Sequence, residues 1–154
     1  MTVQHVGFAT AASGVASNAA DWLPAPLDDG FASAYAEAAD RVLAAFAAAA
    51  AADGTLQQRV LLPEISTTVT FPAAQAISFH FIDYVVHSWD VARSADLPMA
   101  FAPDVLDAAL TVAEAVPQGE SRLRAGAAFG PVVEVPADAP ALDRIVAVLG
   151  RSPS

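Results

Sequence analysis

Alanine makes up about a quarter of this chain, 38 of its 154 residues, and no other feature constrains the fold as strongly. Alanine has the highest helix propensity of the amino acids and is depleted in strands. Apolar residues recur at three- and four-residue spacing, as at Phe31, Tyr35, Ala38, Val42 and Phe46. This periodicity predicts amphipathic helices. We therefore expect a mainly α-helical fold, and the length is that of a single domain covering residues 1–154.

Proline and glycine divide the expected helices from one another. Alternating β-branched and polar residues around Pro63 predict two short strands or an extended excursion before residue 72. A second extended, proline-bounded segment, "AAFGPVVEVPADAP" (residues 127–140), is expected before the last helix. The expected helices span residues 2–18, 29–52, 72–95, 103–116 and 140–149. The pattern predicts a helical bundle with a few short extended segments.

The charge and cysteine content exclude several classes of function. A net charge of −10 and a pI near 4.3 argue against binding to nucleic acid or to an anionic membrane surface, because both need a basic face. The chain has no cysteine, so it offers neither a disulfide framework nor a thiolate. Any metal would have to be held by His, Asp or Glu. The longest apolar run, residues 42–52, is too short to cross a bilayer, and the N-terminus lacks a signal-peptide pattern, so we expect a cytoplasmic protein.

The scarce polar chemistry is concentrated in "HFIDYVVHSWD", residues 80–90. On a helix, His80, Asp83 and His87 fall within about 60° of one another, and Asp90 extends the stripe by one turn. Asp83 and His87 stand at i and i+4, the spacing with which helical bundles present a carboxylate and an imidazole to a metal. The alternative is a surface ion pair or a structural buried histidine. A third metal ligand would have to come from another helix, where His5 is the one remaining histidine.

Three motifs carry a resemblance to a known family. The segment "DYVVHSWDVARSADLP" resembles the D-x-x-x-H-x-W-D-x-A-R-x-x-G signature of an actinobacterial family related to the N-terminal domain of mycothiol-dependent maleylpyruvate isomerase. The tail "AFGPVVEVPADAPALDRIVAVLGRSP" is similar to that family's C-terminal signature, and "VQHVGF" resembles the H-[LV]-x-G segment of its second helix. The three matches extend over nearly the whole chain. The resemblance implies the four-helix bundle of the DinB/YfiT-like superfamily.

Carried over residue by residue, the family's metal triad falls on His5, Asp83 and His87. The resemblance implies a divalent ion, zinc first and nickel second, which would bind the sulfur of a small thiol such as mycothiol. His80, Asp90 and Arg93 are expected around these ligands or against the substrate. Asp90 would either orient His87 or pair with Arg93, and Arg93 would either receive an anionic group or be an ordinary helix arginine.

One departure from the family leaves two functions open. Its members carry a further helix before the "VQHV" segment, so this chain corresponds to a bundle without its first helix; a start codon assigned too late would give the same sequence. The groove expected there favours a homodimer. The first function is a metal-dependent thiol transferase or isomerase acting on a small electrophile. The second is a non-catalytic or degenerate module that binds a metal or small ligand and dimerises.

Overall fold

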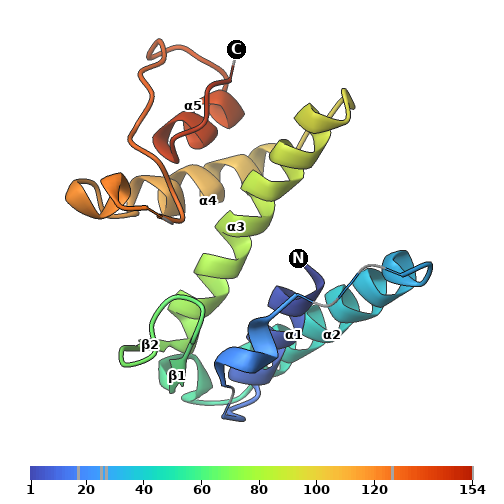
Figure 1. Ribbon diagram of the computed structural model, residues 1–154. Helices are drawn as coiled ribbons and strands as arrows, with labels where there is room; N and C mark the ends of the chain where they lie inside the picture. The colour runs from blue at the N-terminus through green and yellow to red at the C-terminus, as the bar shows by residue number, and fades with distance from the viewer. Residues whose placement is uncertain (17, 25, 27, 126, 154) are drawn as a thin grey trace. The chain divides into compact units, whose positions relative to one another are not determined.

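The computed structural model describes residues 1–16, 18–24, 26, 28–125 and 127–153, and it is mainly helical, as the alanine content predicts (Figure 1). The α-helices are α1 (Thr2–Ala12), α2 (Phe31–Ala51), α3 (Ala73–Ser94), α4 (Pro103–Glu114) and α5 (Ala141–Val148). Short 3-10 helices are η1 (Ala19–Trp22), η2 (Thr55–Gln57) and η3 (Glu120–Leu123). The chain forms two compact units, a first unit of Met1–His80 and a second unit of Phe81–Ser154, and α3 runs from one into the other.

Four of the expected helices are confirmed to within a few residues at their ends, but the first is shorter than predicted. It ends at Ala12, whereas the spacing of apolar residues predicted a helix to residue 18. Gly14 adopts a left-handed backbone conformation with φ of +72°, and its N–H donates to the carbonyl of Ala11. The N–H of Val15 donates to the carbonyl of Thr10, so the last turn is closed in the manner of a Schellman motif. Ser17 lies outside the described residues.

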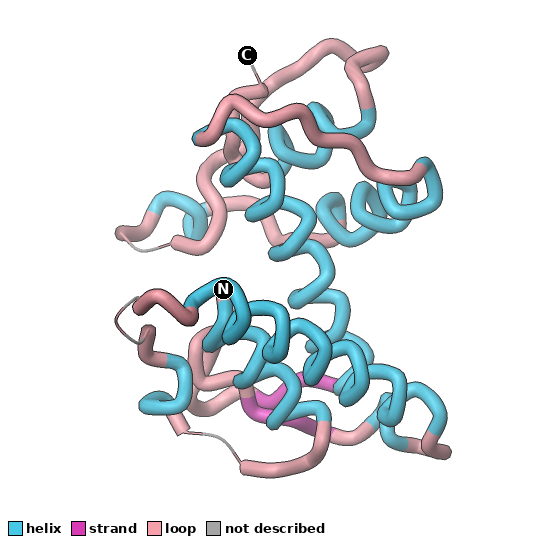
Figure 2. The backbone as a smooth tube through the Cα atoms, turned by 90° about the vertical axis from the view of Figure 1, so that its right-hand side faces the viewer, coloured by secondary structure: helices cyan, strands magenta, loops and turns pink. Residues whose placement is uncertain are grey.

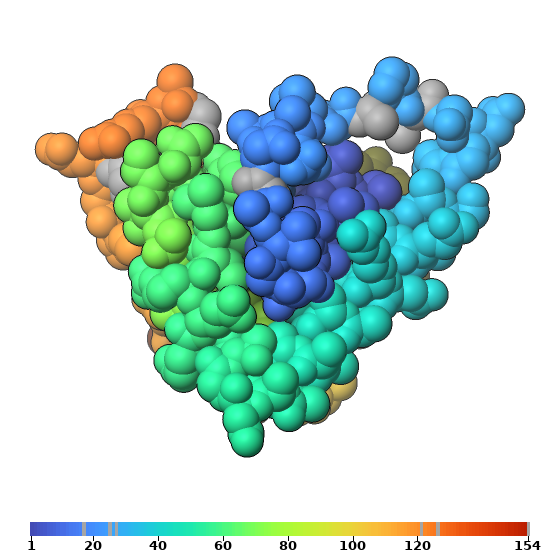
Figure 3. Space-filling model, turned by 90° about the horizontal axis from the view of Figure 1, so that it is seen from below, coloured from blue at the N-terminus to red at the C-terminus, as the bar shows by residue number. Residues whose placement is uncertain are grey.

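In the first unit, α1 packs against α2 and against a small hairpin. The strands β1 (Arg59–Leu61) and β2 (Thr70–Pro72) pair antiparallel, with Val60 opposite Phe71. The two strands expected before residue 72 are thus confirmed, and Figure 2 shows them beside the helices of this unit. In the space-filling view, the dark-blue atoms of α1 lie between the cyan atoms of α2 and green atoms of later residues (Figure 3).

The first unit is built around aromatic and aliphatic side chains from several elements. Phe8 of α1 and Trp22 of η1 meet edge to face with ring centroids 5.3 Å apart, and Val42, Val60 and Leu62 complete this part of the core. Edge-to-face contact suits the quadrupoles of the two rings.

The second unit has its own core where the end of α3 meets α4 and α5. Ile82 and Val86 of α3 pack with Ala109 of α4 and with Ile145 and Leu149 at the end of α5. Ala109 is fully buried, and its small side chain permits a close approach of the neighbouring helices. The expected extended segment lies alongside α5, where the N–H of residue 133 donates to the carbonyl of residue 147 at 2.9 Å.

A buried arginine joins three segments of the second unit. The Arg122 guanidinium donates to the carbonyls of Val116 and Pro117 just after α4, of Gly130 in the extended segment, and of Val148 at the end of α5. Burial lowers the pKa of Arg122, because desolvation penalises the charged form. Four charge-assisted hydrogen bonds offset that cost and fix the distances between the segments.

No helix formed by the described residues has both the length and the apolar composition that crossing a membrane requires.

Gly7→Ala tests the packing of α1 against Trp22. A Cβ at this position would lie 2.6 Å from two Trp22 ring atoms, so the ring would have to move. Overpacking costs about 1–3 kcal/mol, which exceeds the helix-propensity gain of about 1 kcal/mol. We expect a net loss in the free energy of unfolding, measured by urea denaturation. In a Trp22→Leu background the same substitution should cost less; an equal cost in both backgrounds would show that the Trp22 ring is not the obstacle.

Arg122→Met tests the arginine that joins the second unit. Removing the guanidinium leaves carbonyls without their donor, and we expect a loss of about 3–5 kcal/mol in the free energy of unfolding. Arg124→Met is the matched control, because Arg124 is exposed two residues along the chain and should change stability by less than about 0.5 kcal/mol. Equal losses for both variants would contradict this role for Arg122.

Candidate functional site

His87 lies between two carboxylates on one face of α3. Its Nε2 is 3.3 Å from Asp83 Oδ1, one turn earlier, and its Nδ1 is 3.2 Å from Asp90 Oδ2, three residues later. The i, i+4 and i, i+3 spacings of a helix bring these side chains together, so the sequence prediction that they share a face is confirmed. All three side chains are partly buried.

The two carboxylates shift the titration of this histidine. The hydrogen bond that His87 donates to Asp83 is the largest effect. Together with the charge of Asp83 and the bond and charge of Asp90, it raises the pKa of His87 above 6.5 against the opposing effect of burial. His87 therefore binds a proton more tightly than an exposed histidine does. A doubly protonated ring donates from both nitrogens, which suits acceptors on both sides.

Asp90 pairs with an arginine from the far end of the chain. Arg151 donates from Nε to Asp90 Oδ1 at 3.3 Å and from an Nη to Oδ2 at 3.0 Å, and it also donates to the carbonyl of Leu149. Of the two roles expected for Asp90, the contact with His87 is present, whereas its guanidinium partner is Arg151 and not Arg93. The Arg93 side chain instead lies over the Trp89 ring, with its Cζ 5.7 Å from the ring centroid.

A glycine turn directs Arg151 toward Asp90. Gly150 has φ of +84°, and a Cβ there would lie 2.6 Å from Gly130 Cα, so a side chain at this position would strike backbone. The N–H of Arg151 donates to the carbonyl of Val146, which closes the end of α5.

Asp83 has coordination capacity that its described partners leave unused. Oδ1 faces His87, while Oδ2 is buried and has no hydrogen-bond partner among the described residues. A buried carboxylate oxygen without a donor is costly, and a cation would relieve that cost. The described residues contain no group of three or more His, Asp or Glu side chains arranged to hold a metal ion. Asp83 and His87 thus offer a carboxylate and an imidazole that fit a divalent ion only as part of a larger set.

In the first unit, His5 and His80 form a buried pair. His5 Nδ1 and His80 Nε2 are 2.9 Å apart, a hydrogen bond in which one ring donates and the other accepts. The rings of Tyr35, Phe8 and Phe46 surround the pair, each with its centroid 5.1 Å from one of the two imidazoles. Burial, with a smaller effect from the N-terminal amine, lowers the pKa of His5.

The predicted ligands therefore fall into two groups. Asp83 and His87 belong to the second unit and contact each other, and His5 belongs to the first unit, where it contacts His80. His80 contacts His5, and its role beside a metal ligand stays a prediction. The triad takes one residue from the first unit and two from the second, and it remains a prediction.

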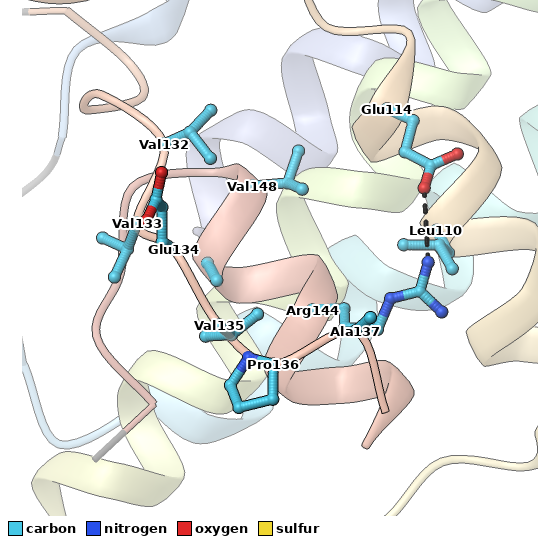
Figure 4. A pocket seen from close by; sticks show the side chains of 11 residues that line it. Leu110, Glu114, Val132, Val133, Glu134, Val135, Pro136, Ala137, Arg144 and Val148 are labelled. Carbon is cyan, nitrogen blue, oxygen red and sulfur yellow. Dashed lines mark ion pairs between the residues drawn. The ribbon is translucent and has the colours of Figure 1, made fainter. Parts of the chain in front are cut away.

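A cavity of about 320 Å³ also lies in the second unit, between α4, the extended segment and α5 (Figure 4). Valine, leucine and proline side chains provide most of its lining. The Glu114–Arg144 ion pair, 3.6 Å long and solvent-exposed, borders it. None of the predicted site residues is among its described lining residues.

Sequence reasoning missed Arg151 and this cavity. Arg151 lies in the tail "AFGPVVEVPADAPALDRIVAVLGRSP", so its place in a segment that resembles a family signature is the available signal for a role beyond solvation. The cavity is formed by ordinary apolar residues whose spacing gives no such signal.

The pKa of His87 provides a direct test of the two-carboxylate arrangement. We expect an NMR titration of the wild-type protein to give a midpoint above 6.5. Asp83→Asn should lower it more than Asp90→Asn, because the Asp83 hydrogen bond is the larger effect. The linked stability is fully present below pH 6.5 and is lost as the pH rises through the folded-state pKa, and His87→Gln should abolish this loss. A His87 midpoint at or below 6.5 would contradict the arrangement.

Compared with protein-family models, with curated proteins and with solved structures, the chain matches none, so the family resemblance drawn from its motifs remains a prediction.

Proposed function

We propose that this chain is a metal-dependent enzyme of the DinB/YfiT-like type that uses a small thiol to attack or isomerise a small electrophile. The proposed ligands of the divalent ion are His5, Asp83 and His87. The observation that carries the proposal is the same contact at both histidines: Nδ1 of His5 is held by His80, and Nδ1 of His87 is held by Asp90.

This contact is typical of histidines that bind metals. A metal-ligating histidine usually presents one nitrogen to the ion while its other N–H donates to a carboxylate, a backbone carbonyl or water. Asp90 is such an acceptor for His87, and His80 takes that place for His5 in the tautomer in which His5 Nδ1 donates. In both residues Nδ1 has such a partner, so Nε2 is the atom that would face an ion; at His87 this atom lies 3.3 Å from Asp83 Oδ1. His80 and Asp90 then act as orienting partners, one for each ligand.

Asp83 supplies the negative charge of the proposed site. Its buried Oδ2 is available to a cation, and its Oδ1 already lies beside His87 Nε2. To bind an ion, His87 would release any proton on Nε2, and Nε2 would contact the metal in place of Asp83 Oδ1. Protons and metal would therefore compete for His87, and metal affinity would fall as the pH falls through its raised pKa.

The chain contains no cysteine, so the nucleophilic sulfur would come with a co-substrate such as mycothiol. A bound divalent ion, zinc first and nickel second, would lower the pKa of a coordinated thiol and so provide thiolate at neutral pH. Two histidines and one carboxylate leave coordination positions open for that sulfur. The homodimer stays a prediction from the sequence, and the mass of the protein in solution tests it.

One observation favours the non-catalytic alternative. Both nitrogens of His87 face carboxylate oxygens within 3.3 Å, so the Asp83–His87–Asp90 network is satisfied at this ring without an ion. Such a network is a structural ion-pair cluster if no metal binds.

Metal content tests the proposal. We expect elemental analysis of untagged protein to give about one divalent ion per chain, because three ligands suffice for tight binding at a site with open positions. His5→Ala, Asp83→Ala and His87→Ala should each lose it, while Asp107→Ala, an exposed carboxylate on α4, should keep it.

Two results would contradict different parts of the proposal. Wild-type metal content in His5→Ala would remove His5 from the ligand set while leaving the pair on α3. No metal in the wild-type protein, together with a melting temperature that is unchanged by chelator, would favour the non-catalytic module.

A further inference from the structure

Arg151 is more firmly held than a surface arginine. Besides its two bonds to Asp90, it donates to the carbonyl of Leu149 at 3.1 Å, and its Cζ lies 5.7 Å from the centroid of the Phe129 ring. Its side chain is about one-fifth exposed. With the Gly150 turn fixing its backbone, the guanidinium has few alternative positions.

We propose that Arg151 is a positioning residue that fixes the orientation of the His87 ring through Asp90. The order of contacts is Arg151 to Asp90, Asp90 Oδ2 to His87 Nδ1, and His87 Nε2 toward Asp83. Its consequence for metal binding rests on the proposed function, whereas its effect on the ring in the metal-free protein does not.

The geometry of Asp90 explains why a second residue is needed. A partly exposed carboxylate at i+3 gains little from a histidine on the same helix, since such contacts contribute only a few tenths of a kcal/mol. The bidentate guanidinium fixes both oxygens and so directs Oδ2 at Nδ1. Without it, Asp90 would exchange the histidine for water, and Asp83 would hold the ring alone through Nε2.

The charges lead to the same assignment. Arg151 offsets the negative charge of Asp90. Asp83 is therefore the carboxylate beside His87 whose charge would attract a cation. Lysine would supply the charge but not the two parallel bonds. Arg151 therefore separates the roles of the two carboxylates: Asp90 orients the ring and Asp83 attracts the ion.

The test measures the His87 ring in metal-free protein. Nitrogen-15 NMR at a pH where the ring is neutral gives the ratio of its Nδ1–H and Nε2–H tautomers. We expect Arg151→Gln to shift the ratio toward Nε2–H, because Asp83 then holds the ring alone, and Arg151→Lys to restore part of the Nδ1–H population. Arg144→Gln is the matched control, since its ion pair with Glu114 is solvent-exposed and contacts neither Asp90 nor His87.

An unchanged ratio in Arg151→Gln, or a shift toward Nδ1–H, would overturn the proposal, since the latter would mean that Arg151 acts only by weakening the charge of Asp90. If Arg151→Gln does not fold, Asp90→Asn decides instead: it should give the same shift toward Nε2–H, and an unchanged ratio would overturn the proposal.

In metal titrations, Arg151→Gln should weaken affinity by about 10- to 100-fold, the usual effect of losing an orienting partner. Should even the wild-type protein bind no metal, the proposed function fails, and the tautomer ratio still decides the role of Arg151.

Discussion

A buried arginine that pairs with no carboxylate among the described residues organises the second unit. The hydrogen bonds that the Arg122 guanidinium makes within this part of the chain go to backbone carbonyls of the segment after α4, the extended segment and the end of α5. Burying an unpaired charge costs several kcal/mol, so the three segments must supply these carbonyls together. Their shared donor brings Gly130 against the turn at Gly150, and that turn gives Arg151 its direction toward α3. The surroundings of His87 thus depend on an arginine that does not contact it.

Local physics explains which parts of the fold the sequence predicted. Helix propensity and apolar spacing act within a few residues of the chain, and they located α2 to α5 correctly. The alternation of β-branched residues located the two short strands, which the structure pairs as a hairpin. The end of α1 depended on one glycine, Gly14, whose left-handed conformation the apolar spacing does not encode. The division into two units depends on which distant side chains share a core, and the single-chain pattern carries no such information.

The distinction between local helix geometry and tertiary packing applies to the site as well. Asp83, His87 and Asp90 were predicted to share a face because helical geometry alone places them there. The partner of Asp90 is 61 residues away, and the partner of His5 is 75 residues away, so both depend on tertiary structure. His80 was expected near the ligands from its place on the helix, but its contact with His5 is a product of the packing of the first unit. The metal triad itself rests on the resemblance and on the way each histidine is held.

Gly130 and Gly150 contact each other, but the space for a side chain differs between them, and this has a consequence for how the sequence can vary. A Cβ on Gly130 would meet Gly150 at an ordinary contact distance of 3.5 Å, whereas a Cβ on Gly150 would collide with the Gly130 backbone. Alanine should therefore be tolerated at position 130, whereas selection should remove substitutions at position 150. Among descendants of this sequence, we expect Asp90, Gly150 and Arg151 to be conserved together, while position 130 varies between glycine and alanine.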